Sequence, residues 1–206
     1  MCNLYRMTRT ADEVARLFRA DPLTVHANWV GELYPGLPGL VMAEGRVRTM
    51  TWGFPLVVKG KQGQPLKSKP VNNARTDKLA GPFWRASLAA RRCLIPVTAY
   101  AEAEGLAGAK TRTWMTLPDA KAAPGGTFAV AGLWRPTVEW DEAYAMVIDE
   151  ACVAVQGVHL RMPAIIPPHE WDAWLHGSAE EAVALCRPWS GAIDVERTDA
   201  PWVKRP

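Results

Sequence analysis

Apolar residues recur along this chain with two different periods. From Ala11 to about Arg19 they recur at helical spacing behind a capping box that starts at Thr10, which predicts a short amphipathic helix. Elsewhere the apolar runs are short or alternate with polar residues, and Gly and Pro bound them, as is typical of strands. The predicted strands are 40–42, 46–52, 93–96, 98–103, 112–117, 128–134 and 144–148, and the further predicted helices are 81–92, one that opens at Pro167-Pro168 and one capped at Ser178.

Two segments carry no clear period. Residues 59–78 hold six basic residues against Asp77 alone, with several Gly and Pro, and are predicted to form a loop. The tail from Trp189 is predicted to be irregular. Many short strands with few helices indicate an α+β, mostly β fold. We expect a single domain over 1–206, with largely antiparallel strands in a barrel-like sheet core and a few peripheral helices.

The composition indicates a folded protein and is compatible with nucleic-acid binding. Of the 206 residues, 49% are hydrophobic and 22% are charged, which favours a packed core over disorder. The net charge of +3 is compatible with nucleic-acid binding without being diagnostic of it. The start lacks the pattern of a secretory signal, and no apolar run reaches ~18 residues. We therefore expect a monomer in the cytoplasm, associated with the nucleoid when bound to DNA, and no membrane partner.

The cysteine and histidine spacing argues against a metal site. The four cysteines, at positions 2, 93, 152 and 186, form no CxxC pair. His159, His169 and His176 are spaced unlike any common zinc ligand set. We expect no metal and no cofactor, and thiols that stay reduced.

Cys2 has unusual chemical potential because it follows the initiator Met1. Removal of Met1 would leave a thiol and a free α-amine on adjacent carbons, a pair that condenses with an aldehyde to a five-membered thiazolidine. A terminal amine titrates at roughly 7.7–8.0 and a thiol at about 8.5, so both nucleophilic forms are populated near neutral pH. Taken alone, the first five residues favour the explanation that Cys2 is an accident of translation start.

Three other places carry polar chemistry that a core does not need. They are Asn73 with Arg75, Glu102, and His159 with Arg161. Glu102 stands out because it interrupts a run of small apolar residues, where an unpaired carboxylate would be costly. Each place alone has an ordinary explanation: paired Asn residues make turns, and a single His or Glu often serves structure.

Together and in this order, these motifs resemble the SOS-response-associated peptidases, also described as abasic-site processing or thiazolidine-forming DNA–protein crosslink proteins. The resemblance runs from Met1 to about Trp174. Its motifs are Met1-Cys2, Trp52-Gly53, Asn73-Ala74-Arg75-Thr76-Asp77, Arg92-Cys93-Leu94-Ile95-Pro96 followed by Glu102, Ala131-Gly132-Leu133-Trp134, and His159-Leu160-Arg161-Met162-Pro163. The chain departs from the usual family pattern at Asn3, Leu4, Ala103 and Leu160.

The resemblance implies covalent capture of abasic sites in single-stranded DNA by the Cys2 amine and thiol, which shields the lesion during the DNA damage response. It implies catalytic roles for four residues and DNA contacts for four more. The catalytic set is Cys2, Asn73 to orient the N-terminus, Glu102 to move protons during ring closure, and His159 to assist at the imine stage. The DNA-binding set is Arg75 and Arg161 on flanking phosphates, with Trp52 and Pro35 lining the DNA path.

Two other functions remain open from the residues. The same Cys2, Glu102 and His159 could serve an N-terminal cysteine peptidase or amidohydrolase, whose minimal activity would be autoproteolytic removal of Met1; a classification as hydrolase, protease or lyase would follow. A non-catalytic single-strand binder using the 59–78 segment and exposed tryptophans is the third.

Overall fold

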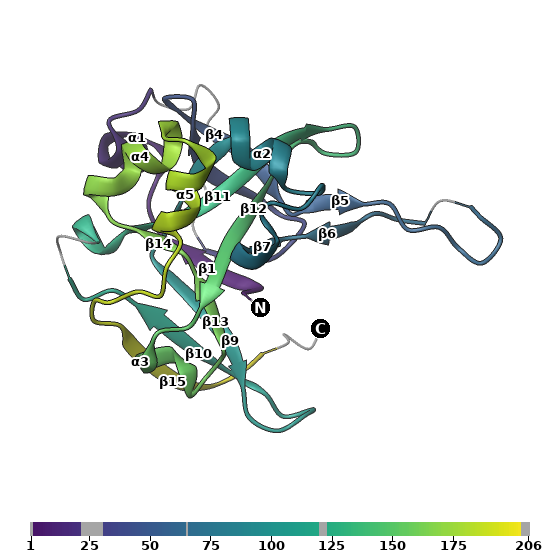
Figure 1. Ribbon diagram of the computed structural model, residues 1–206. Helices are drawn as coiled ribbons and strands as arrows, with labels where there is room; N and C mark the ends of the chain where they lie inside the picture. The colour runs from purple at the N-terminus through teal and green to yellow at the C-terminus, as the bar shows by residue number, and fades with distance from the viewer. Residues whose placement is uncertain (1, 22–30, 65, 120–122, 203–206) are drawn as a thin grey trace.

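The computed structural model describes residues 2–21, 31–64, 66–119 and 123–202 (Figure 1). Met1, whose removal the predicted chemistry requires, lies outside the described residues. The element order confirms the predicted α+β, mostly β class.

A closed five-stranded barrel forms the core. Its strands follow one another in the order β12, β4, β3, β8 and β11, and β11 pairs again with β12. All pairs are antiparallel except β4–β12, which is parallel. Closure leaves these strands without a free edge, so their apolar runs are buried. Their bounds are β3 Pro38–Ala43, β4 Arg46–Trp52, β8 Arg92–Val97, β11 Phe128–Thr137 and β12 Asp141–Glu150.

A second, five-stranded sheet carries the N-terminus. Its order is β15-β10-β9-β1-β2, so the first strand lies inside the sheet between β9 and β2. Because β9 follows directly on barrel strand β8, this sheet is joined to the barrel, and the residue before β1 lies where the two meet. The bounds are β1 Leu4–Met7, β2 Gly31–Leu33, β9 Ala99–Glu104, β10 Thr111–Thr116 and β15 Asp194–Pro201.

Short strands extend the barrel around β12. Strand β7 pairs in parallel, and strand β13 antiparallel, with the C-terminal half of β12. A separate two-stranded hairpin, β5–β6, projects from the body (Figure 1). The pairing of β7 and β13 with β12 brings these three segments, which are far apart in sequence, to one end of the barrel. The bounds are β5 Phe54–Leu56, β6 Lys69–Val71, β7 Asn73–Arg75, β13 Arg161–Pro163 and β14 Ile165–Ile166.

Helices cover the outside, and α1, α4 and α5 gather on the side away from the projecting hairpin (Figure 1). Both predicted capping boxes are confirmed: Thr10 and Ser178 each accept from the backbone N–H three residues on, and Glu13 and Glu181 return the bond. The bounds are α1 Ala11–Phe18, α2 Arg85–Ala90, α3 Val153–Gln156, α4 Trp171–His176 and α5 Ala179–Leu185, with 3-10 turns at Thr76–Lys78, Pro124–Gly126 and Pro168–Glu170.

Three predicted segments were wrong. The helix predicted over 81–92 covers only Arg85–Ala90, because Arg92 already belongs to barrel strand β8. The loop predicted over 59–78 contains strands β6 and β7. The tail predicted to be irregular contains β15, which pairs with β10. The last two errors share a cause: these strands are short or largely exposed, so they show no apolar alternation.

Three buried aromatic rings pack together where β1 meets the barrel: Tyr5 of β1, Trp52 of β4 and Tyr144 of β12. The Tyr5 and Tyr144 hydroxyl oxygens are 2.6 Å apart, and the Trp52 ring packs edge-on against Tyr5 at 4.9 Å between centroids. Gly39 on β3 makes room for them, since a Cβ there would lie 2.3 Å from the Tyr144 hydroxyl and 2.6 Å from that of Tyr5. Neighbouring side chains therefore fill the space in which a side chain at position 39 would lie.

Gly39→Ala is therefore expected to destabilise the protein by about 1–3 kcal/mol, the usual range for overpacking a filled core. Urea unfolding followed by tryptophan fluorescence measures the change in midpoint. Gly157 is the control position, because it has no atom within 4 Å of a built Cβ and no positive φ. Gly36 is less suitable because its φ is 87°. Gly157→Ala should leave the midpoint nearly unchanged; an equal loss in both variants would contradict the packing explanation.

Candidate active site around Cys2

Cys2 lies two residues before the start of β1 and is almost completely buried, with 1% of its surface exposed. Its thiol donates a weak hydrogen bond to the Leu4 carbonyl oxygen at 3.6 Å. Burial raises the pKa of the Cys2 thiol far above its usual range, and the nearby Glu102 carboxylate raises it further. The resting group is thus a neutral thiol, which needs a base before it can act as a nucleophile.

Glu102 is the ionisable neighbour whose charge acts on that thiol. It lies on β9 with 3% of its surface exposed, facing the same side of the strand as Tyr100 two residues earlier. Burial raises the pKa of Glu102 from 4.5 to about 7, while the positive charge of Lys110 opposes the shift. A carboxyl with this pKa can accept and return a proton near neutral pH.

Two side-chain amides hold the backbone of Cys2. The Nδ2 groups of Asn73 and Asn72 donate to the Cys2 carbonyl oxygen at 2.8 and 2.9 Å. Asn72 Nδ2 also reaches Asn3 Oδ1 at 3.0 Å. Trp52 donates its indole N–H to the Asn72 carbonyl oxygen at 3.2 Å and so supports this segment from behind. Cys2 and Asn3 are thus fixed by three hydrogen bonds, two to the Cys2 carbonyl and one to the Asn3 side chain, from residues about 70 positions away in the sequence.

His159 lies between α3 and β13, and its ring is oriented by the backbone that follows it. His159 Nδ1 lies 2.9 Å from the Arg161 backbone nitrogen and 3.0 Å from the Arg161 carbonyl oxygen, so the Arg161 backbone orients the ring through Nδ1 and leaves Nε2 outside this contact. Partial burial lowers the pKa of His159, and the charges of Lys110 and Arg161 act in the same direction. The imidazole is therefore neutral at physiological pH and available as a proton acceptor.

Arg75 and Arg161 reach the same end of the barrel from opposite edges of β12. Ile148 on β12 pairs with Arg75 of β7 on one edge and with Pro163 of β13 on the other. Arg75 binds Asp77 through two hydrogen bonds, at 2.9 and 2.7 Å, and its side chain is 45% exposed. Both arginines lower the pKa of Asp77. A phosphate that bound Arg75 would have to compete with this carboxylate.

The two predicted DNA-lining residues have different surroundings. Trp52 has no exposed surface, so its ring belongs to the core and cannot line a DNA path in this conformation. The Trp52-Gly53 motif gives no sign of this burial, because the aromatic packing against Tyr5 and Tyr144 is long-range. Pro35 is half-buried in a surface turn, where the next N–H, of Gly36, donates to the Trp52 carbonyl oxygen at 2.7 Å.

The predicted catalytic residues Cys2, Asn73 and Glu102 are thus brought together. The positive charge of Lys110 acts to lower the pKa of both Glu102 and His159. Two site residues were not predicted. Asn72 could have been suspected from the Asn72-Asn73 pair, but only the hydrogen bonds in the structure show that both amides point at Cys2. Lys110 lies in the β9–β10 turn and has no signal in the sequence.

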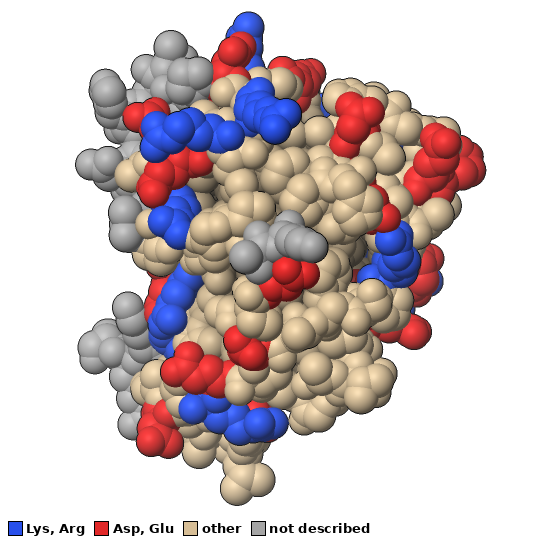
Figure 2. All heavy atoms as spheres, turned by 90° about the vertical axis from the view of Figure 1, so that its left-hand side faces the viewer, with Lys and Arg blue, Asp and Glu red and all other residues tan. Residues whose placement is uncertain are grey.

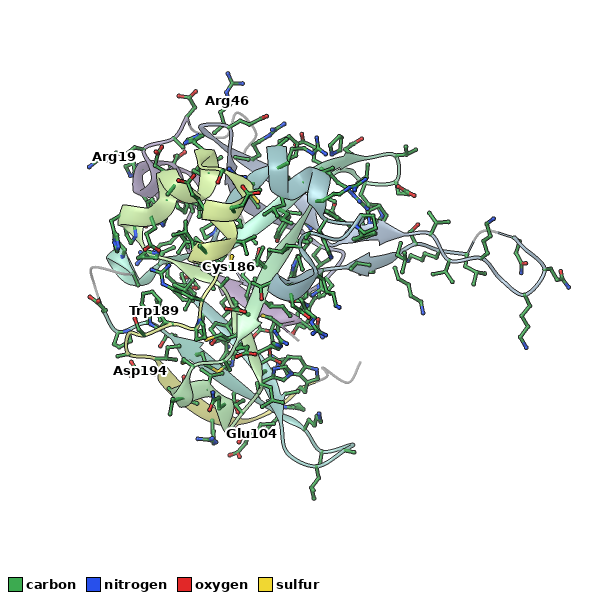
Figure 3. All side chains as sticks on the ribbon, viewed as in Figure 1. Arg19, Arg46, Glu104, Cys186, Trp189 and Asp194 are labelled. Atoms are coloured by element: carbon green, nitrogen blue, oxygen red, sulfur yellow. The ribbon has the colours of Figure 1, made fainter. Side chains whose placement is uncertain are left out.

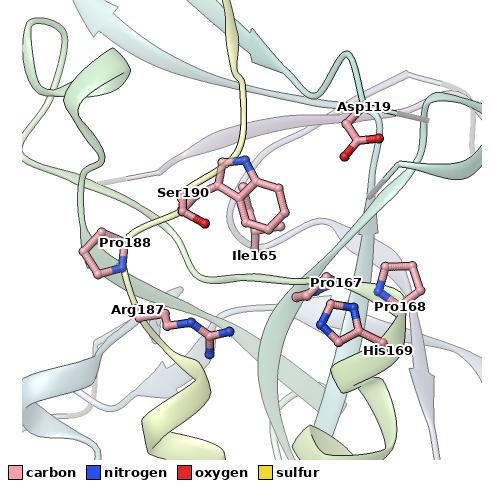
Figure 4. A pocket seen from close by; sticks show the side chains of 9 residues that line it. Asp119, Ile165, Pro167, Pro168, His169, Arg187, Pro188 and Ser190 are labelled. Atoms are coloured by element: carbon pink, nitrogen blue, oxygen red, sulfur yellow. The ribbon is translucent and has the colours of Figure 1, made fainter. Parts of the chain in front are cut away.

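A cavity of about 400 Å³ lies elsewhere, between the segment after α5 and the turn before α4 (Figure 4). It contains none of the predicted site residues and lacks a buried nucleophile, so it offers no chemistry related to Cys2. The residues lining it are Asp119, Ile165, Pro167, Pro168, His169, Arg187, Pro188, Trp189 and Ser190.

Among the described residues, no group of three or more His, Cys, Asp or Glu side chains is arranged to hold a metal ion. None of the helices in the described part of the chain is both long and apolar enough to cross a membrane.

Comparison with known proteins identifies relatives of the whole chain. The family model described as "SOS response associated peptidase (SRAP)" matches residues 1–200. A comparison with curated proteins found no match.

Three crystal structures are similar in fold. A protein from Bacteroides thetaiotaomicron is 19% identical with a TM-score of 0.74, over 95% of this chain and 91% of that one. A protein from Bordetella bronchiseptica is 21% identical with a TM-score of 0.75, over 96% and 99%. A phage-related protein from the same organism is 19% identical with a TM-score of 0.68, over 96% and 94%. At these identities the likeness shows a shared fold alone.

Proposed function

The chain belongs to the SOS response associated peptidase family, and from this membership and the surroundings of Cys2 we propose that it captures abasic sites in single-stranded DNA. After loss of Met1, the Cys2 amine and thiol form a thiazolidine with the ring-opened aldehyde of the lesion. The product is a covalent DNA–protein crosslink that shields the lesion. The observation that carries the proposal is the burial of Cys2 beside Glu102, with its carbonyl held by two amides.

The chemistry divides into two steps whose protons these residues can move. The Cys2 amine adds to the aldehyde carbon, and the oxygen leaves as water once it has received two protons, giving an imine. Protonated Glu102 is the proposed proton donor, and the neutral His159 ring relays protons at the imine stage through Nε2. The Cys2 thiol then gives its proton to the Glu102 carboxylate, sulfur bonds to the imine carbon, and the imine nitrogen takes up a proton. The net change is loss of one water.

The DNA contacts follow from the same end of the barrel. Arg75 and Arg161 flank the site from opposite edges of β12 and suit phosphates on either side of the lesion. Pro35 lies in an adjoining surface turn. Trp52 acts through Asn72 as a buried support. An abasic sugar has no base to unpair, so its insertion costs less than flipping a normal nucleotide.

Intact mass spectrometry with and without an abasic single-stranded oligonucleotide tests the proposal. The expected result is a protein lacking Met1 that gains the mass of the oligonucleotide less one water. The same strand with an intact base should give no adduct. A Met1-free protein that forms no adduct with the abasic strand would contradict the proposal.

The alternative of an N-terminal cysteine hydrolase has weaker support. The two amide donors are bonded to the carbonyl of Cys2 itself, which is not the carbonyl attacked when the Met1–Cys2 bond is cleaved. They therefore do not form an oxyanion hole for that reaction. Turnover of an amide substrate in the absence of any DNA adduct would favour this alternative.

The two amides should be separable by mutation. Asn73→Ala and Asn72→Ala each remove one hydrogen bond to the Cys2 carbonyl, worth about 1 kcal/mol, so each should slow adduct formation about five- to tenfold. Single-turnover crosslinking at saturating DNA measures the rate. Asn3→Ala, which removes only the contact to Asn72, should have a smaller effect. A normal rate in the Asn72→Ala/Asn73→Ala double variant would contradict a positioning role.

A further inference from the structure

The β5–β6 hairpin, residues 54–71, is the most prominent projection of the molecule (Figure 1). We call its outer part, from the last strand pair Leu56–Lys69 outward (residues 56–69), the arm. Backbone hydrogen bonds continue along it, from Leu66 N to Val58 O at 2.8 Å and from Gly60 N to Gln64 O at 2.8 Å. The arm is thus a continued hairpin. With about six residues on each side, it reaches roughly 20 Å from the body.

The base of the arm is anchored in the body. Phe54 is fully buried, its ring lies 5.2 Å from that of Trp84, and the Arg135 guanidinium lies 4.1 Å above it. Gly53 and Pro70 pack so closely that a Cβ on Gly53 would lie 2.4 Å from the Pro70 side chain. A firmly held base gives the exposed part a fixed direction.

The charge on the arm has one sign. Lys59, Lys61, Lys67 and Lys69 are all exposed, and residues 56–71 include no Asp or Glu. Within the described part of the chain, none of the four forms an ion pair. The opposite side of the molecule differs, since Figure 2 shows Lys and Arg interspersed with Asp and Glu there.

The arm is continuous with the candidate active site. Its outgoing strand follows Trp52, and its returning strand leads within two residues to Asn72 and Asn73, whose amides hold Cys2. A strand of DNA that reached Cys2 would therefore pass the root of the arm. The exposed apolar side chains on it, Leu56, Val57 and Leu66, are aliphatic and offer no ring for base stacking.

We propose that the arm is a second DNA-binding element, which holds the phosphate backbone of single-stranded DNA next to the lesion through its four lysines. It supplies affinity without base preference and takes no part in the chemistry at Cys2. This inference rests on the proposed function, because its ligand is the same DNA strand.

Salt dependence of binding gives a quantitative test. The K59Q/K61Q/K67Q/K69Q variant is compared with the parent protein, both carrying Cys2→Ala so that only non-covalent binding to an intact single strand is measured. Each lost phosphate contact on a single strand lowers the slope of log K against log salt by about 0.7, so the slope should fall by about 2–3. Affinity at low salt should fall about 100-fold or more. Oligonucleotides of different base composition should bind alike.

A charge-matched control separates the arm from general basicity. Lys59→Gln with Lys61→Gln is compared with Arg16→Gln and Arg46→Gln. Arg16 lies on α1, which is away from the arm in Figure 1, and Arg46 begins β4 and is labelled away from the arm in Figure 3. Only the arm variant should lose slope. With Cys2 intact, the concentration of abasic DNA that gives half-maximal crosslinking should rise in the arm variant and stay unchanged in the arginine control.

The outcomes distinguish this inference from the proposed function. An unchanged slope in the four-lysine variant, or an equal loss in the arginine control, overturns the arm proposal even if crosslinks form normally. If the slope falls as expected in the four-lysine variant but no protein forms a crosslink, the arm remains a DNA contact and the capture of abasic sites is contradicted instead.

Discussion

Replacing Cys2 with alanine is expected to abolish the covalent adduct with abasic single-stranded DNA, while non-covalent binding of the strand persists. The amine alone still forms an imine, but without sulfur the ring cannot close, and an imine reverts by hydrolysis. Cys2→Ser keeps the amine and a weaker nucleophile, so any adduct should be lost on denaturation. Gel electrophoresis after heating in detergent measures stable adduct directly.

The control is another buried cysteine that is remote from the site. Cys186 ends α5 and is 8% exposed, compared with 1% for Cys2 (Figure 3). Cys186→Ala should crosslink as the parent protein does. A chain that carries an extra residue before Cys2 should fail as completely as Cys2→Ala, because its amine is acylated. Normal adduct yield from either Cys2→Ala or the extended chain would contradict thiazolidine formation.

The chemistry of the site could be predicted from the sequence to a greater extent than its geometry. Cys2, Asn73, Glu102 and His159 stand in motifs that can be read in order along the chain. Their proximity depends on β1 inserting between β9 and β2, and on β12 pairing with segments on both edges. Such pairings join residues far apart in sequence and leave no local pattern.

Trp52 and β15 show the same limit in two ways. The motif places Trp52 beside the site, but its burial comes from Tyr5 and Tyr144, which lie in other strands. Strand β15 is an edge strand of largely exposed, polar residues, Asp194–Pro201. Without an inward-facing apolar set it has no alternation, and only its pairing with β10 makes it a strand.

Glu102→Gln is expected to slow crosslinking about 100-fold or more, the usual contribution of a positioned acid–base group. Glutamine keeps the shape of the side chain and cannot exchange protons, so binding of the strand should be unaffected. The pH profile should change as well. With a pKa of about 7, Glu102 is available as a proton donor below neutral pH, and the parent rate should fall as the pH rises through this value. That falling limb should be absent in the variant.

Unfolding measurements separate this effect from damage to the fold. The pKa of Glu102 is raised in the folded protein, so its contribution to stability is greatest below about pH 4.5 and is lost as the pH rises through about 7. Above pH 7 the parent protein holds a buried carboxylate that the variant lacks. Glu102→Gln should therefore be at least as stable as the parent protein at pH 8, yet slower to crosslink. A variant that crosslinks at the parent rate and keeps the falling limb would contradict the proton-transfer role of Glu102.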